Sequence, residues 1–365
     1  MPDPERFSAA SLIDFVDRVL QRFDVPPDDA RVTAEILVEA DLMGIESHGV
    51  AHLMVHPSYV LGFKQGVVNP HPNIRVVHET PSTALVDGDG GLGPVVGHRA
   101  MSIAIQKAKE CGTGMVAATR SRHYGIAGYY ALMAVPHDMI GLALTNSPPF
   151  VAPAFGRGRM LGTNPIAVAV PTGSGHPFLL DMATSAASHG KFEIARREGK
   201  PIPLAWGADE EGNPSDDMTR IMSRGWLLPL GSTPEAASYK GYDLAMVVDI
   251  LSGVLSGVGL SLHIDYIKHE VGHFCGALRI DGFRPVDEFK AMMDEMLHAF
   301  RSAPTVGGAE RVLTAGQREF ETRDERLARG IPLHASVVGL LRRLADEVGL
   351  PMPEPLGQAG GLGNV

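Results

Sequence analysis

Short apolar runs alternate with longer segments of helical periodicity along most of this chain. The runs that predict strands cover 83–87, 115–119, 140–145, 166–170, 178–180 and a stretch near 273–280. Apolar residues at helical spacing predict helices over 94–109, 241–257 and 285–301. Strands that alternate with helices in this way are typical of an α/β protein.

Both ends of the chain are expected to be helical. From Ser8, a plausible N-cap, to Glu39 the apolar spacing predicts two helices, and a further helix is predicted to run through Tyr59. A terminal helical region is predicted over 334–349, and the glycine-rich residues 356–365 are expected to form a loose tail. Glycine and proline cluster in the middle of the chain, where they predict shaped loops of the kind that contact ligands.

Charge and cysteine content exclude several classes of protein. A net charge of −10 over 365 residues argues against a nucleic-acid or anionic-membrane partner, because both need a basic surface. The two cysteines, Cys111 and Cys275, are too few for a disulfide framework or a multi-cysteine zinc site. No stretch approaches the roughly 18 apolar residues of a membrane span, and the first residues lack the pattern of a signal peptide. The composition therefore predicts a cytoplasmic globular enzyme or binding protein.

A glycine-rich motif, G-x-G-x-x-G, lies at Gly88–Gly93 between a predicted strand and a predicted helix. In a Rossmann unit such glycines permit a tight turn, and the helix N-terminus binds a pyrophosphate. The next strand ends in Thr119-Arg120; an NAD site would carry Asp or Glu there, so this interpretation predicts an NADP-dependent reductase. The alternative is a turn that binds no phosphate, since the motif alone is weak evidence.

A second motif, H-E-x-x-H, covers His269–His273. A zinc protease needs both histidines on one face of a helix, with the glutamate as base. Gly272 disfavours a helix, and the residues that follow are more typical of a strand. We therefore expect no metal at this motif.

A third set of polar residues is spread along the chain at predicted loop and strand ends. Each group is flanked by Gly, Pro or Ala, a composition that suits a cleft where backbone approaches a ligand closely. Taken singly, each histidine in the set could equally be a capping or buried residue. The segments are Glu46–Val50, Ser121–Tyr129, Thr145–Pro148, Leu161–Pro165, Asp181–Ser185 and Tyr239–Tyr242.

In their order along the chain, the sequences SHG, H-x-G-x-x-G-Y, TNSP, LGTNP, DMATS, GK and KGY resemble the malate/L-lactate dehydrogenase family. That family also includes ureidoglycolate, diketogulonate, sulfolactate and piperideine-2-carboxylate enzymes. The resemblance extends to residues 313–334 with their GIPL turn. It implies a non-Rossmann α/β fold whose helical N- and C-terminal segments pack together. It also implies a homodimer, or a dimer of such dimers, with a cleft shaped by both subunits.

On this resemblance we expect three structural units. Residues 1–75 with 310–350 would form a helical domain, and 76–118 with 265–305 an α/β domain for cofactor and dimer contacts. Residues 119–264 would form a central, loop-rich α/β domain.

The resemblance also implies an oxidoreductase that transfers a hydride between NAD or NADP, with NAD favoured, and a small 2-hydroxy/2-oxo or 2-imino acid such as malate, lactate or ureidoglycolate. His48 matches the histidine that gives a proton to the ketone oxygen, and His123 matches a second histidine that orients the substrate or shares the proton. Ser47 would hold the substrate oxygen or fix the imidazole. Further substrate-binding residues would be His52, Arg122, Tyr124 and Thr163, and cofactor-binding residues would be Ser147, Asn164, Asp181, Met182, Ala183, Lys240 and Gly316.

The chain departs from the family pattern at several positions. His52 stands one helical turn after His48, where the family usually has an arginine suited to bidentate carboxylate binding. Arg122 could compensate, or it could be a solvated surface residue. Residues 314–317 alter the family's closing loop, while Tyr239 and Asp243 replace a frequent histidine and a glycine around Lys240. These changes predict an atypical substrate.

A non-catalytic ligand-binding protein on the same scaffold is the alternative from another class. The presence of both His48 and His123 favours the enzyme.

Overall fold

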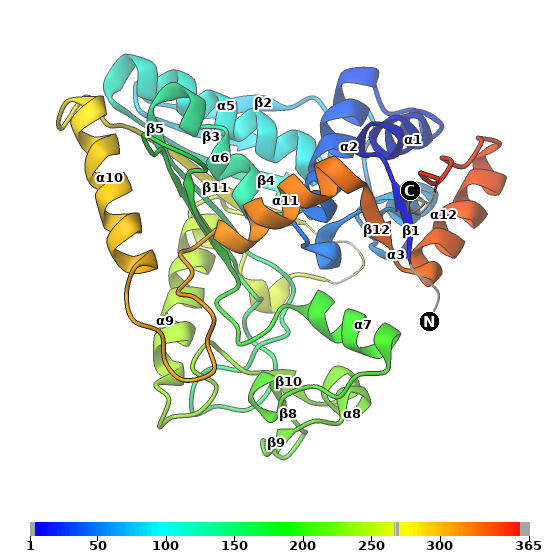
Figure 1. The fold of residues 1–365 in the computed structure, drawn as a ribbon. Helices are drawn as coiled ribbons and strands as arrows, with labels where there is room; N and C mark the ends of the chain where they lie inside the picture. The colour runs from blue at the N-terminus through cyan, green and yellow to red at the C-terminus, as the bar shows by residue number, and fades with distance from the viewer. Residues whose placement is uncertain (1–3, 266, 268–269, 358–365) are drawn as a thin grey trace, which may run out of the picture.

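A seven-stranded sheet organises the chain in the computed structural model, which describes residues 4–265, 267 and 270–357 (Figure 1). Its strand order is β2-β3-β4-β11-β5-β6-β7. Only the neighbours β3 and β4 are parallel, and the other pairs in this sheet are antiparallel. The strands are β2 (Arg75–Glu79), β3 (Thr83–Asp87), β4 (Thr113–Ser121), β5 (Met139–Thr145), β6 (Ile166–Val170), β7 (Phe178–Met182) and β11 (Val271–Arg279).

The glycine-rich loop Gly88–Gly93 joins β3 to α5 (Gly93–Cys111), and this strand-helix-strand unit is the feature that resembles a Rossmann domain. A Rossmann domain, however, rests on a mostly parallel sheet. The amides of Gly88 and Gly90 donate to the carbonyl oxygens of Thr119 and Arg120, at 2.9 and 2.8 Å. A Cβ on Gly93 would lie 2.1 Å from the carbonyl oxygen of Arg122. The loop is packed against the end of β4, and the Rossmann interpretation is wrong.

The described part of the H-E-x-x-H motif, residues 270–273, leads into a strand and not a helix. His273 lies in β11, fully buried, with its two ring nitrogens 2.9 Å from Thr145 Oγ1 and 2.7 Å from Ser121 Oγ. His269 lies outside the described residues. Because both nitrogens of His273 are engaged by hydroxyl groups, the zinc-protease interpretation fails.

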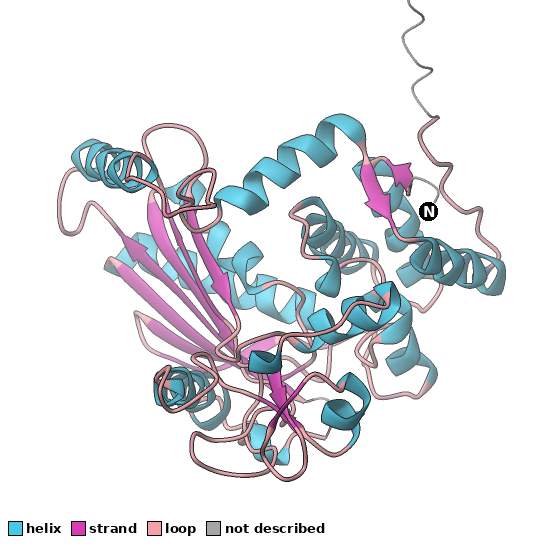
Figure 2. Ribbon diagram, turned by 60° about the horizontal axis from the view of Figure 1, so that its bottom comes forward, coloured by secondary structure: helices cyan, strands magenta, loops and turns pink. Residues whose placement is uncertain are grey.

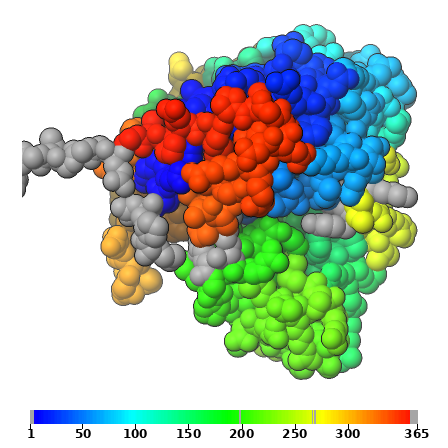
Figure 3. Space-filling view, turned by 90° about the vertical axis from the view of Figure 1, so that its right-hand side faces the viewer, coloured from blue at the N-terminus to red at the C-terminus, as the bar shows by residue number. Residues whose placement is uncertain are grey.

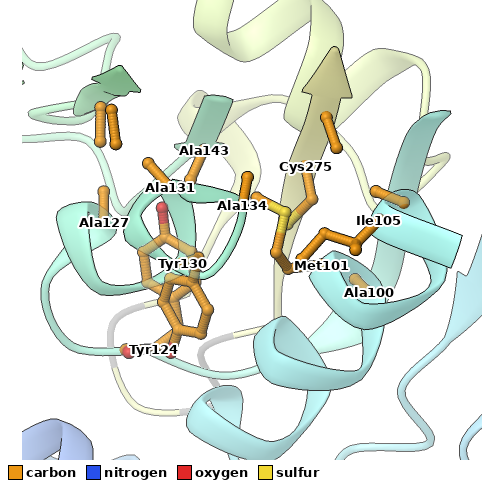
Figure 4. Close-up of a cluster of buried hydrophobic side chains, with 14 of the residues drawn as sticks. Ala100, Met101, Ile105, Tyr124, Ala127, Tyr130, Ala131, Ala134, Ala143 and Cys275 are labelled. Carbon is orange, nitrogen blue, oxygen red and sulfur yellow. Dashed lines mark hydrogen bonds between the residues drawn. The ribbon is translucent and has the colours of Figure 1, made fainter. Parts of the chain in front are cut away.

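Helices α5 and α6 (Ala127–Leu132) cover one face of the sheet. Their backbones approach it closely at two glycines, since a Cβ on Gly114 or Gly141 would lie 2.0 Å from a helix carbonyl oxygen. Figure 4 shows the core that results, in which Met101 and Tyr130 pack near Cys275 of β11. The apolar residues spaced along 94–109 therefore form the buried side of α5, and the predicted helix is confirmed.

The opposite face of the sheet carries α9 (Ser238–Asp249) and the π-helical turn Ile250–Val254. Val248 packs there on Ala117 and Phe274, which alternate along their strands with residues of the first face. The single helix predicted over 241–257 is thus interrupted at Ile250. In the long helix α10 (Val286–Arg301), Leu297 is the one residue that is buried.

The two ends of the chain share a second core beside the sheet. Phe7, Leu12 and Leu341 are fully buried in it, and Ser8 caps the first helix by accepting a hydrogen bond from Ser11 N at 3.0 Å, as predicted. Figure 3 shows the N-terminal and C-terminal segments lying against each other. The elements are β1 (Glu5–Phe7) paired with β12 (Ile331–Leu333), and the helices α1 (Ala9–Gln21), α2 (Pro27–Leu42), α11 (Gln317–Arg329) and α12 (Ala335–Val348).

The helix predicted to run through Tyr59 is broken. α3 (His52–Val55) ends at His56, which is extended (φ −96°, ψ 132°) because a proline follows it, and α4 (Val60–Lys64) begins anew. A small lobe lies at the other end of the sheet (Figure 2). It contains α7 (His189–Glu198), α8 (Met218–Ser223), β8 (Gly207–Ala208), β9 (Pro214–Ser215), β10 (Trp226–Leu227) and the short 3-10 turn Leu204–Trp206.

In the part of the chain that the structure describes, no helix combines the length and the apolar character needed to cross a membrane.

Candidate active site

Four histidines from two separate segments meet beside the sheet. His48 ends the 3-10 turn η1 (Glu46–His48), His52 and His56 follow at intervals of one helical turn, and His123 comes from the loop after β4. The ring of His123 lies 4.3 Å from that of His56, 5.1 Å from that of His52 and 5.4 Å from that of His48, measured between centroids. We call these four residues the histidine cluster.

His48 is held in one orientation by its neighbour. Ser47 Oγ lies 2.8 Å from His48 Nδ1, which leaves Nε2 as the nitrogen that can face a ligand. Burial, reinforced by the charge of His189, lowers the pKa of His48 to about 4. The imidazole is therefore neutral near pH 7 and suited to accept a proton. Gly190 of α7 packs directly on Ser47, since a Cβ there would lie 2.4 Å from Ser47 Cβ.

His52 is buried, with 7% of its surface exposed, and its Nδ1 has no hydrogen-bond partner among the described residues. Burial lowers its pKa well below the usual value, and the charges of His123, His48 and His189 act in the same direction. His52, predicted from sequence as a substrate-binding residue, thus lines the cavity with an unpaired nitrogen, and a buried polar atom of this kind is rare without a partner.

His123 is held by backbone and by a tyrosine. Its Nδ1 lies 3.3 Å from the hydroxyl of Tyr59 and accepts from Gly125 N at 3.4 Å, while its own amide donates to Ser58 Oγ. The neighbouring Tyr124 lines the cavity, but its ring is stacked between His273 and Tyr130 in the core (Figure 4). Its hydroxyl is buried without a hydrogen-bond partner among the described residues, as is Nδ1 of His52.

The histidine cluster and the loops that follow β5 and precede β6 line one shared cavity. Among its described lining residues are five histidines, Glu193 and several hydroxyl groups, but no lysine or arginine. The lining comprises His48, His52, Val55, His56, His123, Tyr124, Gly125, Thr145, Asn146, Ser147, Pro148, Phe150, Thr163, Pro165, Ser188, His189, Gly190, Glu193 and Val271.

Ser147 and Thr163, predicted from sequence to bind cofactor and substrate, lie together at this cavity. Thr163 N donates to Ser147 Oγ at 3.0 Å, and the two hydroxyl oxygens are 3.4 Å apart. Asn164 is fully buried behind them: its Oδ1 accepts from Ser147 N, and its Nδ2 donates to the carbonyl oxygen of Ala245. The Asn164 amide therefore joins the two loops to α9.

A buried carboxylate that the sequence analysis missed completes this support. Asp249 accepts hydrogen bonds from the amide and hydroxyl of Ser261 and from Asn146 Nδ2, at 2.9 to 3.1 Å. Asn146 in turn accepts from Gly272 N. No sequence motif marks Asp249, because its partners lie 12 to 103 residues away.

The other predicted cofactor residues lie apart from the histidine cavity. Asp181 and Gly316 line a second cavity with Arg318 and Glu319. Asp181 Oδ2 accepts from Gly128 N at 2.7 Å, and burial raises the pKa of this carboxyl to about 7. Met182 and Ala183 are half-buried beyond it, and Lys240 is exposed in the first turn of α9.

Arg122 is not among the residues that line the histidine cavity. It is buried, and its Nη2 lies beside the glycine-rich loop, 3.8 Å from where a Cβ on Gly90 would be. Its Nε and Nη1 have no hydrogen-bond partner in the described chain. The alternative prediction, that Arg122 is a solvated surface residue, is therefore wrong.

His56 and His189 were also missed from the sequence. The regular spacing of His48, His52 and His56 could have indicated a shared face, whereas nothing in sequence links His189 to them. The His189 ring packs on Phe150 at 4.7 Å, and burial lowers its pKa to about 4. Within the described residues, no group of three or more His, Cys, Asp or Glu side chains has the arrangement of a metal site.

Comparison with known proteins matches residues 7–342 to the malate/L-lactate dehydrogenase family model. The chain is 47% identical to the malate dehydrogenase of Pyrococcus horikoshii, over 93% of this chain and 94% of that one. It is 38% identical to the L-sulfolactate dehydrogenase of Methanocaldococcus jannaschii, over 91% and 94%. The crystal structure of malate dehydrogenase from Entamoeba histolytica superposes with a TM-score of 0.93 at 33% identity, over 96% and 100%.

These relatives are named as enzymes, which favours catalysis over the non-catalytic alternative. Family dehydrogenases use a nicotinamide cofactor, as the resemblance implied. The chain belongs to the malate/L-lactate dehydrogenase family and is an oxidoreductase that acts on the CH–OH group of small hydroxy acids.

Proposed function

We propose that this enzyme interconverts a small 2-hydroxy acid with a second anionic group, malate first among the candidates, and the matching 2-oxo acid. The observation that carries this proposal is the half-buried, hydrogen-bonded pair Ser47–His48, at the wall of a cavity whose other polar groups are mostly imidazoles and hydroxyls. The names of the relatives support the acid class, since malate and sulfolactate each carry two acidic groups.

His48 moves the proton. A neutral imidazole whose Nδ1–H donates to Ser47 Oγ has a lone pair on Nε2, and this lone pair accepts the hydroxyl proton as the alcohol is oxidised. In the reverse direction the imidazolium gives the proton back to the ketone oxygen. His123, which Tyr59 and Gly125 hold in place, orients the substrate.

The residues present fit a nicotinamide dinucleotide. Ser147 and Thr163 offer hydroxyls beside the histidines, Asp181 has a carboxylate oxygen for a ribose hydroxyl, and exposed Lys240 offers an ammonium group for a phosphate. Met182, Ala183 and Gly316 would form backbone walls for it. When bound, the cofactor supplies the hydride acceptor or donor. NAD is the first candidate in this proposal, and the comparison of NADH with NADPH below decides between the two cofactors, because the second cavity holds both Glu319 and Arg318.

The test is direct. NADH or NADPH is titrated against the fluorescence of Trp206 and Trp226, and turnover is then measured over a panel of 2-hydroxy, 2-oxo and 2-imino acids. We expect NADH to bind more tightly and malate, or another acid with two anionic groups, to give the highest kcat/KM. Highest activity on an uncharged alcohol would contradict the proposal.

We also propose that two copies associate through the α9 face of the sheet. Leu244, Val247, Ile250, Val254 and Leu255 follow one side of α9 and the π-helical turn, and each is 38 to 57% exposed. Half-buried apolar residues of the sheet adjoin them, as does an apolar cavity under α10. An apolar face of this extent on a single chain is typical of an interface.

Substitution of Ile250 by glutamate should therefore convert the dimer to monomer in sedimentation velocity, because a charge would be buried at the contact. Leu327→Glu, on the exposed side of α11, is the matched control and should leave the dimer intact. A wild-type chain that sediments as a monomer would refute the interface.

A further inference from the structure

The described residues of the histidine cavity offer an anion no permanent positive charge. Its described lining contains neither lysine nor arginine, and Glu193 is the one carboxylate in it. A carboxylate taken from water into a buried site needs a charge or several hydrogen-bond donors to offset its lost hydration. The five imidazoles are the groups that could provide the charge.

His52 is the best placed of these imidazoles. It is buried, and its Nδ1 lacks a partner among the described residues. Its ring centroid lies 5.0 Å from that of His56, 5.1 Å from that of His123 and 5.5 Å from that of His48. A buried nitrogen with no partner is costly, by roughly 1–3 kcal/mol, unless a ligand satisfies it.

The polar and titratable groups around His52 come from several elements, and few of them are acidic. Ser47 and His48 lie on η1. His56 and Tyr59 lie in the segment after α3, and Tyr124 lies in the loop after β4. His189 and Glu193 lie on α7, and the Glu193 carboxylate lies 3.8 Å from His189 Nδ1. Asp41 of α2 lies behind η1 and α3, where it accepts from the amide of Val50.

Without substrate, His48 and His52 are neutral near pH 7. Burial and the mutual repulsion of the rings lower the pKa of His52, and burial lowers that of His48 to about 4. An anion placed within about 5 Å acts in the opposite direction, because it stabilises the imidazolium form.

We infer that the histidine cluster binds a substrate carboxylate together with a proton, so that His52 becomes charged only when the anion is present. This inference rests on the proposed function and specifies how its substrate is recognised. One proton passes from solvent to a ring nitrogen of His52 as the carboxylate enters, and it returns to solvent when the acid leaves. His48 stays neutral and free to accept the hydroxyl proton.

The consequence is a substrate affinity that depends on pH. Binding that takes up a proton weakens as pH rises, by up to about tenfold per pH unit while free His52 is unprotonated and the complex is protonated, and the dependence ends once the complex itself loses the proton. A fixed guanidinium at the same position would show no such dependence, because arginine stays protonated.

The experiment is isothermal titration calorimetry on the whole chain saturated with NADH (or NADPH, if that cofactor binds more tightly), with L-malate as the probe. Both ligands are reduced, so no hydride is transferred. Titrations at about pH 7.5 in PIPES and in Tris, which differ in heat of ionisation, give the number of protons taken up. We expect close to one proton, and a dissociation constant that rises several-fold from pH 7 to pH 8.

Two variants and a control locate the proton. His52→Arg is expected to bind malate with little proton uptake and a nearly constant affinity, and His52→Gln to bind at least about tenfold more weakly at pH 7, also without uptake. His78→Gln, on an exposed strand outside the cavity, should behave as wild type. Full uptake retained in His52→Gln would overturn the assignment to His52.

The two hypotheses fail differently. An enzyme that oxidises malate and binds it with the same heat in both buffers refutes proton-coupled binding and leaves the proposed function intact. A chain that oxidises no acid of the panel refutes the proposed function, and proton-coupled substrate binding with it.

Discussion

Replacing His48 with alanine is expected to lower kcat for hydroxy-acid oxidation at least about 100-fold, while the dissociation constant of the nicotinamide cofactor changes little. The reason is that His48 is the cavity imidazole whose Nδ1 is fixed by Ser47, so its loss removes the proposed proton acceptor and not the cofactor contacts. Steady-state kinetics and the fluorescence titration measure the two quantities separately.

The pH dependence of kcat gives a second readout. The base must be unprotonated, so kcat falls as pH drops through the pKa of His48 in the substrate complex. In the empty site burial holds the pKa of His48 at about 4. Ser47→Ala should lower kcat less than His48→Ala, since it loosens the ring without removing it. A His48→Ala enzyme that kept most of its turnover would transfer the role of base to His123.

The second large effect is expected from Asp249→Ala. The substitution leaves the amide of Ser261 without its buried acceptor, and it removes one of the two hydrogen bonds made by the Ser261 hydroxyl and by Asn146 Nδ2. An unsatisfied buried donor costs roughly 1–3 kcal/mol and each lost hydrogen bond about 1 kcal/mol, so a loss of about 3–5 kcal/mol in unfolding free energy is expected. Because Asn146 and Asn164 hold the loops that carry Ser147 and Thr163, cofactor affinity should fall as well.

Asp243→Ala is the matched control, because Asp243 lies on the same helix with its side chain exposed. Thermal unfolding and the cofactor titration should distinguish the two variants clearly. If Asp249→Ala kept wild-type stability and wild-type cofactor affinity, the buried carboxylate would not be what anchors the loops.

Local sequence patterns were sufficient for the elements of the fold. Apolar spacing predicted the helix α5 and the strands β3 to β7. Each of these elements buries one face, so its apolar residues recur at the helical or strand period along a short stretch of sequence. The ordered polar loops were sufficient for the family. They also pointed to His48, His123, Ser147 and Thr163, which the structure brings to one cavity.

Only the tertiary structure shows which of the chemically plausible motifs have the surroundings of a binding site. Gly88–Gly93 has the spacing of a phosphate loop, yet two of its amides are bonded to the end of β4, a strand that begins 20 residues later. His273 fits a zinc motif but lies in a strand between two hydroxyls.

The sequence by itself therefore determined the α/β class and the family, and it predicted His48 as the residue that accepts the proton. Only the fold places the ring of His52 beside that of His123, in a cavity whose described lining includes no lysine or arginine. Only the fold places Asp249 beneath the loops of the site. The physical reason is that hydrogen bonding, burial and charge depend on neighbours in space, and here those neighbours are as many as 103 residues apart in the chain.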